Sequence, residues 1–130
     1  MLAGWTAKDG VEWTNMSDQF TRDAGCFVRC AEFIRQHTGQ QAVVTSARDG
    51  KHSINSLHYT GEAIDVRIRD WPQEKVSSLA HDMSSFLPAP WLVLREGDHL
   101  HIQASRTRNI INPSAIIHVG DGAYLEQMRK

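Results

Sequence analysis

The sequence predicts an α+β domain in which a small antiparallel sheet is covered on one face by two helices. Two amphipathic stretches indicate the helices, and short β-branched or alternating segments, two of them joined by a tight turn, indicate the strands. The chain has 130 residues, of which 41% are hydrophobic and 22% are charged. This length and composition are typical of one globular domain, so we treat residues 1–130 as a single unit.

The first predicted helix covers Thr21–Thr38, where apolar residues recur at helical spacing until Gly39 follows as a stop signal. Cys26 and Cys30 lie four residues apart in this helix. Side chains at that spacing share a face but seldom meet the geometry of a disulfide, so we expect two free thiols. The twenty residues before the helix carry no pattern that assigns them.

The strands begin with the β-branched run Ala42–Ala47, which is followed by a loop rich in glycine, asparagine and serine. The segment Glu62–Arg69 then alternates strictly. Its apolar residues on one face are Ile64, Val66 and Ile68, and its charged residues on the other are Asp65, Arg67 and Arg69. One face of this strand is therefore expected to pack, and the other is free for chemistry.

The second predicted helix follows Asp70-Trp71-Pro72, with Asp70 as a possible cap. Its apolar stripe consists of Val76, Leu79, Ala80, Met83 and Leu87, and it ends before Pro88. Trp91–Arg95 and His99–Ala104 are then predicted to form a hairpin around a Glu96-Gly97-Asp98 turn. The segment Asn109–Lys130 receives no assigned task.

Charge and hydropathy exclude two classes of partner. The formal net charge is −1, so the chain lacks the positive excess that drives binding to nucleic acid. No stretch approaches the roughly 18 to 20 apolar residues that cross a membrane. The N-terminus has no basic region followed by an apolar run, so we expect no export signal.

The hairpin carries the first sign of chemistry. His99 and His101 are two residues apart in a strand, so both imidazoles leave the same face while Leu100 and Ile102 point into the core. If the two strands are neighbours, that face lies against Asp65. Two imidazole nitrogens and one carboxylate oxygen, with a fourth position open, are the ligands of a catalytic zinc site.

Two motifs together resemble a known family. Ser56-x-His58-x-x-Gly61-x-Ala63-x-Asp65, followed downstream by Asp98-His99-x-His101, is similar to the zinc D-alanyl-D-alanine peptidases. That group includes the VanX- and VanY-type resistance enzymes and the phage L-alanyl-D-glutamate endolysins, and the hedgehog signalling domain is a distant structural relative. The resemblance covers roughly Val43–Gln103, with Thr45–Arg48 matching the strand and arginine before the first motif.

The resemblance implies a role for each matching residue. The zinc ligands fall on His58, Asp65 and His101. The general base of the family, three positions before the last ligand, falls on Asp98; Glu96 competes for that role, and we prefer Asp98. His99 either hydrogen-bonds the reaction intermediate or orients other side chains.

Two further positions complete the implied site. Arg48 matches an arginine that binds substrate and stabilises the oxyanion. Ser56 either ends a loop through backbone hydrogen bonds or faces the substrate, and Gly61 either permits a positive-φ turn or faces the substrate. The remaining histidines are not assigned to the metal; they are His37, His52, His81 and His118.

The implied function is hydrolysis of an amide bond in the stem peptide of peptidoglycan, either the D-Ala-D-Ala terminus or the L-Ala-D-Glu bond. We expect a monomeric phage or prophage lysis enzyme that acts from the host cytoplasm after holin-dependent release, or that is carried on the virion. A cytoplasmic dipeptidase is the alternative for compartment. The rival functions are a catalytically silent zinc-binding module and a structural component of a phage tail stabilised by the metal.

Overall fold

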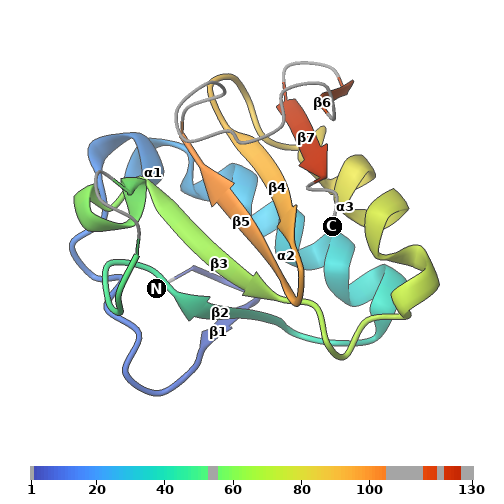
Figure 1. Ribbon diagram of the computed structural model, residues 1–130, viewed down its shortest axis with the longest axis horizontal. Helices are drawn as coiled ribbons and strands as arrows, with labels where there is room; N and C mark the ends of the chain where they lie inside the picture. The colour runs from blue at the N-terminus through green and yellow to red at the C-terminus, as the bar shows by residue number, and fades with distance from the viewer. Residues whose placement is uncertain (1, 53–55, 105–115, 120–121, 127–130) are drawn as a thin grey trace.

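The computed structural model describes residues 2–52, 56–104, 116–119 and 122–126, and it has the predicted α+β class (Figure 1). Its strands form one sheet in the order β1-β2-β3-β5-β4-β7-β6. The strands are β1 Trp5–Ala7, β2 Ala42–Ser46, β3 Ala63–Arg67, β4 Leu92–Glu96, β5 His99–Gln103, β6 Ile116–Val119 and β7 Gly122–Glu126. The helices are α1 Asp18–Arg22, α2 Ala24–Thr38 and α3 Val76–Ser84, with short 3₁₀ turns η1 Leu57–Thr60 and η2 Gln73–Lys75.

The sheet is mixed, which corrects the prediction of a purely antiparallel one. The central strands β2, β3, β5 and β4 are antiparallel neighbours, as expected. However, β1 runs parallel to β2, and β7 runs parallel to β4. Both additions come from chain ends to which the sequence assigned no strand. The helices α1 and α2 connect β1 to β2, as a parallel pairing requires a long crossover.

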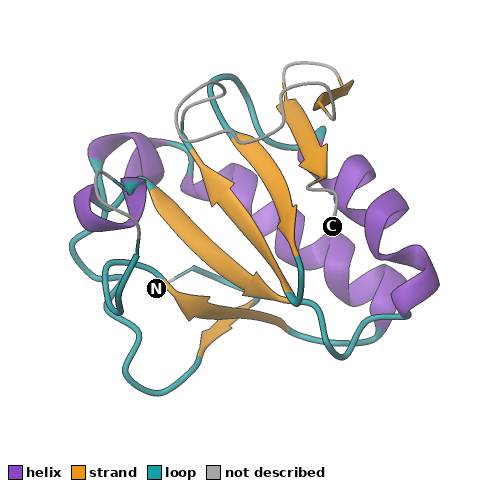
Figure 2. Cartoon of the chain, in the orientation of Figure 1, coloured by secondary structure: helices purple, strands orange, loops and turns teal. Residues whose placement is uncertain are grey.

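Helices α2 and α3 lie together on one side of the sheet (Figure 2). The core joins their apolar residues to those of the central strands, and Ile64, Val66, Leu100 and Ile102 are completely or almost completely buried in it. The predicted alternation in β3 and β5 is therefore confirmed. It leaves Asp65, His99 and His101 on the face that the two helices do not cover.

The first predicted helix is divided into two. Ser17 caps α1, since its Oγ accepts a hydrogen bond from the Phe20 N–H at 3.2 Å. The chain then leaves helical geometry at Asp23, whose carboxylate accepts a hydrogen bond from the Trp91 indole at 2.8 Å. Helical periodicity alone does not reveal such a break, because the apolar stripe continues beyond it.

Asp70 does not cap the second helix, which corrects that prediction. Its carboxylate instead lies 3.9 Å from the Arg69 guanidinium. The chain passes through η2 before α3 begins at Val76, and the Gln73 side chain donates to two backbone carbonyls that precede η2. Neither η2 nor α3 has a side-chain hydrogen bond that caps its start.

The predicted hairpin is present with a shorter turn. Glu96 belongs to β4 and pairs with His99, so only Gly97 and Asp98 form the turn. Gly97 has φ +60°, which a glycine adopts without steric cost. Because Glu96 is a strand residue, its position in β4 determines the face of the sheet from which its side chain projects.

The remaining predictions concern the cysteines, the membrane and the chain end. Cys26 and Cys30 are both free thiols, as expected. Within the described ranges, no helix has the length and apolar character to span a bilayer. Of Asn109–Lys130, the described parts are strands β6 and β7, and the rest of that segment lies outside the described residues.

Candidate metal centre

The register of the sheet brings the two strand ligands together. Asp65 in β3 lies directly opposite His101 in β5, and Leu94 in β4 lies on the other side of His101. One step along the sheet, His99 in β5 lies opposite Glu96 in β4. Because side chains two residues apart share a face, all of these project from the uncovered side of the sheet.

His58 extends from η1 toward Asp65 and His101, and hydrogen bonds cap both ends of this 3₁₀ turn. At the start, Ser56 Oγ accepts a hydrogen bond from the His58 N–H at 3.2 Å. At the end, Gly61 adopts φ +74°, and its N–H donates to the His58 carbonyl at 3.1 Å. Gly61 also lies tightly against the Met16–Ser17 backbone. Ser56 thus forms the backbone hydrogen bond that was one of its two predicted roles, and Gly61 adopts the positive φ that was one of its own.

Replacing Gly61 with alanine should therefore destabilise the fold. The new Cβ would lie 2.8 Å from the Ser17 nitrogen, in a backbone conformation that already disfavours side chains. We expect a loss of about 1–3 kcal/mol in the free energy of unfolding, measured by denaturant titration. Gly10→Ala is the matched control, because Gly10 has φ +87° but its Cβ would meet nothing within 4 Å. Equal losses in the two variants would contradict the close approach at Gly61.

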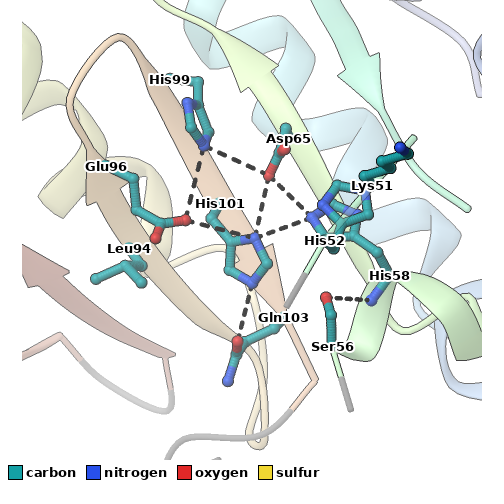
Figure 3. Close-up of a pocket in the computed structure, with 10 residues that line it drawn as sticks. All are labelled: Lys51, His52, Ser56, His58, Asp65, Leu94, Glu96, His99, His101 and Gln103. Atoms are coloured by element: carbon teal, nitrogen blue, oxygen red, sulfur yellow. Dashed lines mark hydrogen bonds and ion pairs between the residues drawn. The ribbon is translucent and has the colours of Figure 1, made fainter. Parts of the chain in front are cut away.

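Three side-chain atoms converge on one point (Figure 3). His58 Nε2 lies 3.1 Å from Asp65 Oδ1 and 3.1 Å from His101 Nδ1, and His101 Nδ1 lies 3.0 Å from Asp65 Oδ1. Ligand atoms around a tetrahedral zinc ion with bonds of about 2.0–2.1 Å lie roughly 3.3 Å apart. The triangle formed by His58 Nε2, Asp65 Oδ1 and His101 Nδ1 therefore needs only a small expansion to hold such an ion.

The other nitrogen of each imidazole fixes which atom faces the triangle. His58 Nδ1 lies 2.7 Å from the Ala47 carbonyl oxygen, and His101 Nε2 lies 2.9 Å from Gln103 Oε1. Both partners are acceptors, so these nitrogens carry the protons. The nitrogens in the triangle then present lone pairs beside a carboxylate oxygen, and three lone pairs at this separation repel unless a cation lies among them. Outer hydrogen bonds of this kind are typical of metal-binding histidines.

The electrostatics also favour a positive charge at the triangle. Burial raises the pKa of Asp65, but His101 and His58 outweigh it when their triangle nitrogens are protonated, because they then donate hydrogen bonds and carry positive charge, so the pKa lies well below its ordinary value. For His101, burial lowers the pKa, but Asp65 and Glu96 reverse the effect and leave it raised. The surroundings thus stabilise a cation at His101 Nδ1, whether a proton or a metal ion.

The two candidate bases occupy different places. Glu96 lines the same cavity as the triangle, and its Oε1 lies 3.7 Å from His101 Nδ1. Asp98 is in the turn with 91% of its side chain exposed, and its contact is with His99 Nδ1 at 2.9 Å. The structure brings Glu96 to the centre and leaves Asp98 outside it, so geometry favours the residue that the sequence ranked second.

His99 lies between these acidic groups. Its Nε2 is 3.6 Å from Glu96 Oε1 and 3.8 Å from Asp65 Oδ1. The hydrogen bond to Glu96 raises the pKa of His99, burial opposes this, and Asp98 and the remaining charges add to the rise, giving about 9. His99 is accordingly a cation at neutral pH at the edge of the cavity.

His52 is close to the triangle but does not fit as a ligand of the same ion. Among the described residues, His52 lies close enough to join His58 and Asp65 around an ion, as Glu96 does to join Asp65 and His101. However, the His52 ring is stacked on the His58 ring, with centroids 3.8 Å apart and planes inclined by 8°. Ring-nitrogen lone pairs lie in the ring plane, so two parallel rings cannot both direct one at a single ion. His52 instead supports His58 by stacking.

The cavity around the triangle has a volume of about 480 Å³. Besides the triangle residues, Ser56, Glu96 and His99, it is lined by Lys51, His52, Leu94 and Gln103 (Figure 3). Sequence reasoning missed Lys51 and Gln103 and left His52 unassigned. Gln103 carries a detectable signal, because it continues the i, i+2 alternation of His99 and His101, whereas no spacing marks Lys51 or His52.

Arg48 stands apart from this cavity. It is exposed, and its guanidinium donates to the Asn15 carbonyl at 2.7 Å. Of the predicted site residues, the structure thus gathers His58, Asp65, His101, Glu96, His99 and Ser56 around one cavity, and leaves Arg48 and Asp98 outside it.

Comparison with models of known protein families found no match, and comparison with curated protein sequences found none either.

Proposed function

We propose that this chain is a zinc-dependent peptidase that hydrolyses an amide bond in the stem peptide of peptidoglycan. The observation that carries the proposal is the triangle of His58 Nε2, Asp65 Oδ1 and His101 Nδ1, whose lone pairs converge at 3.0–3.1 Å in an open cavity. Nitrogen and oxygen ligands in this ratio, with one side open to a cavity, favour zinc in a catalytic rather than a closed structural site.

A zinc ion held there would bring the pKa of a water molecule close to neutrality. Glu96 is the carboxylate placed to accept the proton, because its Oε1 lies within 4 Å of His101 Nδ1 and lines the same cavity. The same carboxylate can then deliver the proton to the leaving amine. We therefore propose Glu96 as the general base in place of Asp98.

His99 supplies positive charge where negative charge develops. Its ring faces the cavity with Nε2 3.6 Å from Glu96 Oε1, and this carboxylate favours the protonated form of His99. A fixed cation of this kind stabilises an oxyanion in the transition state. Asp98 holds the opposite nitrogen of the ring at 2.9 Å, so it orients His99 in this proposal.

The choice of substrate rests on the resemblance of the two motifs to the zinc D-alanyl-D-alanine peptidases. The site itself agrees with a polar peptide, because polar side chains dominate the lining of the cavity and Leu94 is the apolar exception. Both the D-Ala-D-Ala and the L-Ala-D-Glu bonds remain within the proposal.

Digestion of purified peptidoglycan tests the proposal directly. Zinc-loaded protein should release soluble fragments whose masses identify the bond, chelator-treated protein should release none, and added zinc should restore release. Mass spectrometry of the fragments is the measurement. Undiminished release after complete metal removal would contradict a metallopeptidase. Unfolding on metal removal, with no fragments from the loaded protein, would favour the structural tail component instead.

A further inference from the structure

A second cavity continues from the metal centre on the same face of the sheet. It has a volume of about 380 Å³ and shares Asp65 and His99 with the first cavity. The rest of its lining consists of Lys8, Thr45, Arg67, Arg69 and Asp98. A ligand bound at the triangle can therefore extend past His99 into this second cavity.

The sheet itself places Arg67 in this position. Arg67 follows Asp65 by two residues in β3, so both side chains share the uncovered face, and Arg67 pairs with His99 across the β3–β5 ladder. Lys8 comes from the edge of the sheet that β1 forms. It follows β1 directly, and its N–H donates to the Val44 carbonyl at 2.9 Å. Two cations from distant parts of the sequence thus line one cavity.

The charges of this cavity are unbalanced. Its lining has three lysine or arginine side chains and two carboxylates. Both carboxylates are engaged, Asp65 in the triangle and Asp98 with His99. Arg69 contacts Asp70, but the described residues offer no ion pair or hydrogen bond to the Lys8 or Arg67 side chains. A partly buried guanidinium with no partner in the described part of the chain is well suited to hold a carboxylate of a ligand.

We propose that this second cavity is a substrate subsite in which Arg67, supported by Lys8, binds a carboxylate of the peptide close to the bond that is cut. The inference rests on the proposed function and deepens it, because it makes an acidic peptide the preferred substrate. Two strand residues span about 6.6 Å, and an extended peptide covers a similar distance in two residues. The carboxylate recognised by Arg67 therefore lies within about two residues of the scissile amide.

The test compares three forms of one synthetic stem pentapeptide that begins L-Ala-D-Glu and ends D-Ala-D-Ala. The first has all carboxylates free, the second has the glutamate carboxylate amidated, and the third has the C-terminus amidated. Zinc-loaded wild-type protein should show a kcat/KM at least about tenfold lower for one amidated form, as expected for loss of a charge-assisted hydrogen bond. The amidated peptide with the lower kcat/KM identifies which carboxylate Arg67 binds.

Variants then connect this preference to the arginine. Arg67→Gln should lower kcat/KM for the free acid to the level of the affected amide and so abolish the discrimination, and Arg67→Lys should restore part of it. Arg22→Gln, which removes the same charge from the exposed end of α1, should discriminate as the wild type does. Equal rates for all three peptides, or unchanged discrimination in Arg67→Gln, would overturn the proposal.

Binding of the same peptides, measured by calorimetry, separates this inference from the proposed function. If none is cut but the free acid still binds about tenfold more tightly through Arg67, the subsite stands and the peptidase assignment fails. If cleavage occurs without discrimination, the peptidase assignment stands and the subsite fails. Absence of both cleavage and binding would overturn both.

Discussion

Replacing Glu96 with glutamine is expected to lower the rate of peptide hydrolysis by about 10²- to 10⁴-fold while the metal content stays unchanged. The amide has nearly the shape of the carboxylate but cannot carry a proton from water to the leaving amine. Glu96 is placed for this role because it projects from β4 into the cavity beside His101. The measurement is kcat for a stem peptide together with zinc analysis of the same protein.

Asp98→Asn is the matched control for this prediction. Its side chain is 91% exposed and contacts the far nitrogen of His99, so its loss affects orientation rather than proton transfer. We expect it to retain activity within roughly tenfold of the wild type. An inactive Asp98→Asn protein beside an active Glu96→Gln protein would return the role of base to Asp98.

Replacing His101 with alanine should abolish metal binding. His101 Nδ1 is one corner of the triangle, and a site reduced to one imidazole and one carboxylate keeps too few ligands for zinc. We expect the zinc content to fall from about one ion per chain to a small fraction of that, with activity lost in parallel. Elemental analysis after dialysis gives the content, and circular dichroism verifies that the variant is folded.

His52→Phe is the control for the ligand set. Phenylalanine retains an aromatic ring that can stack on His58 but cannot bind a metal, so the zinc content should remain near the wild-type value. A loss of zinc in this variant as large as that in His101→Ala would mean that His52 is a ligand, and the parallel-ring argument would be wrong.

Much of the site was predictable from strand periodicity. Alternation in β3 and β5 places Asp65 and His101 on one face of the sheet and Ile64 and Ile102 on the other. Because Ile64 and Ile102 are buried in the core, Asp65 and His101 must project from the uncovered face. His58 required the motif as well, since a 3₁₀ turn of four residues has too little periodicity to recognise.

Other features depend on contacts that a linear pattern does not contain. The choice between Glu96 and Asp98 depends on the length of one turn, and a shift of one residue decides whether the glutamate belongs to a strand. The parallel strands β1 and β7 pair through contacts between distant segments, which local propensity does not encode. Arg48 was placed by resemblance alone, and its direction depends on the Asn15 carbonyl from the N-terminal segment.

The alternation in β5 also limits how this chain can change in length. Inserting or deleting one residue between Leu100 and His101 would reverse the facing of every later residue in the strand, so Ile102 would enter the cavity and His101 would be forced into the core. The ligand and the apolar packing would be lost in one step. This fold therefore does not tolerate single-residue insertions or deletions in β5. The site can diverge through substitutions, which preserve the two-residue period.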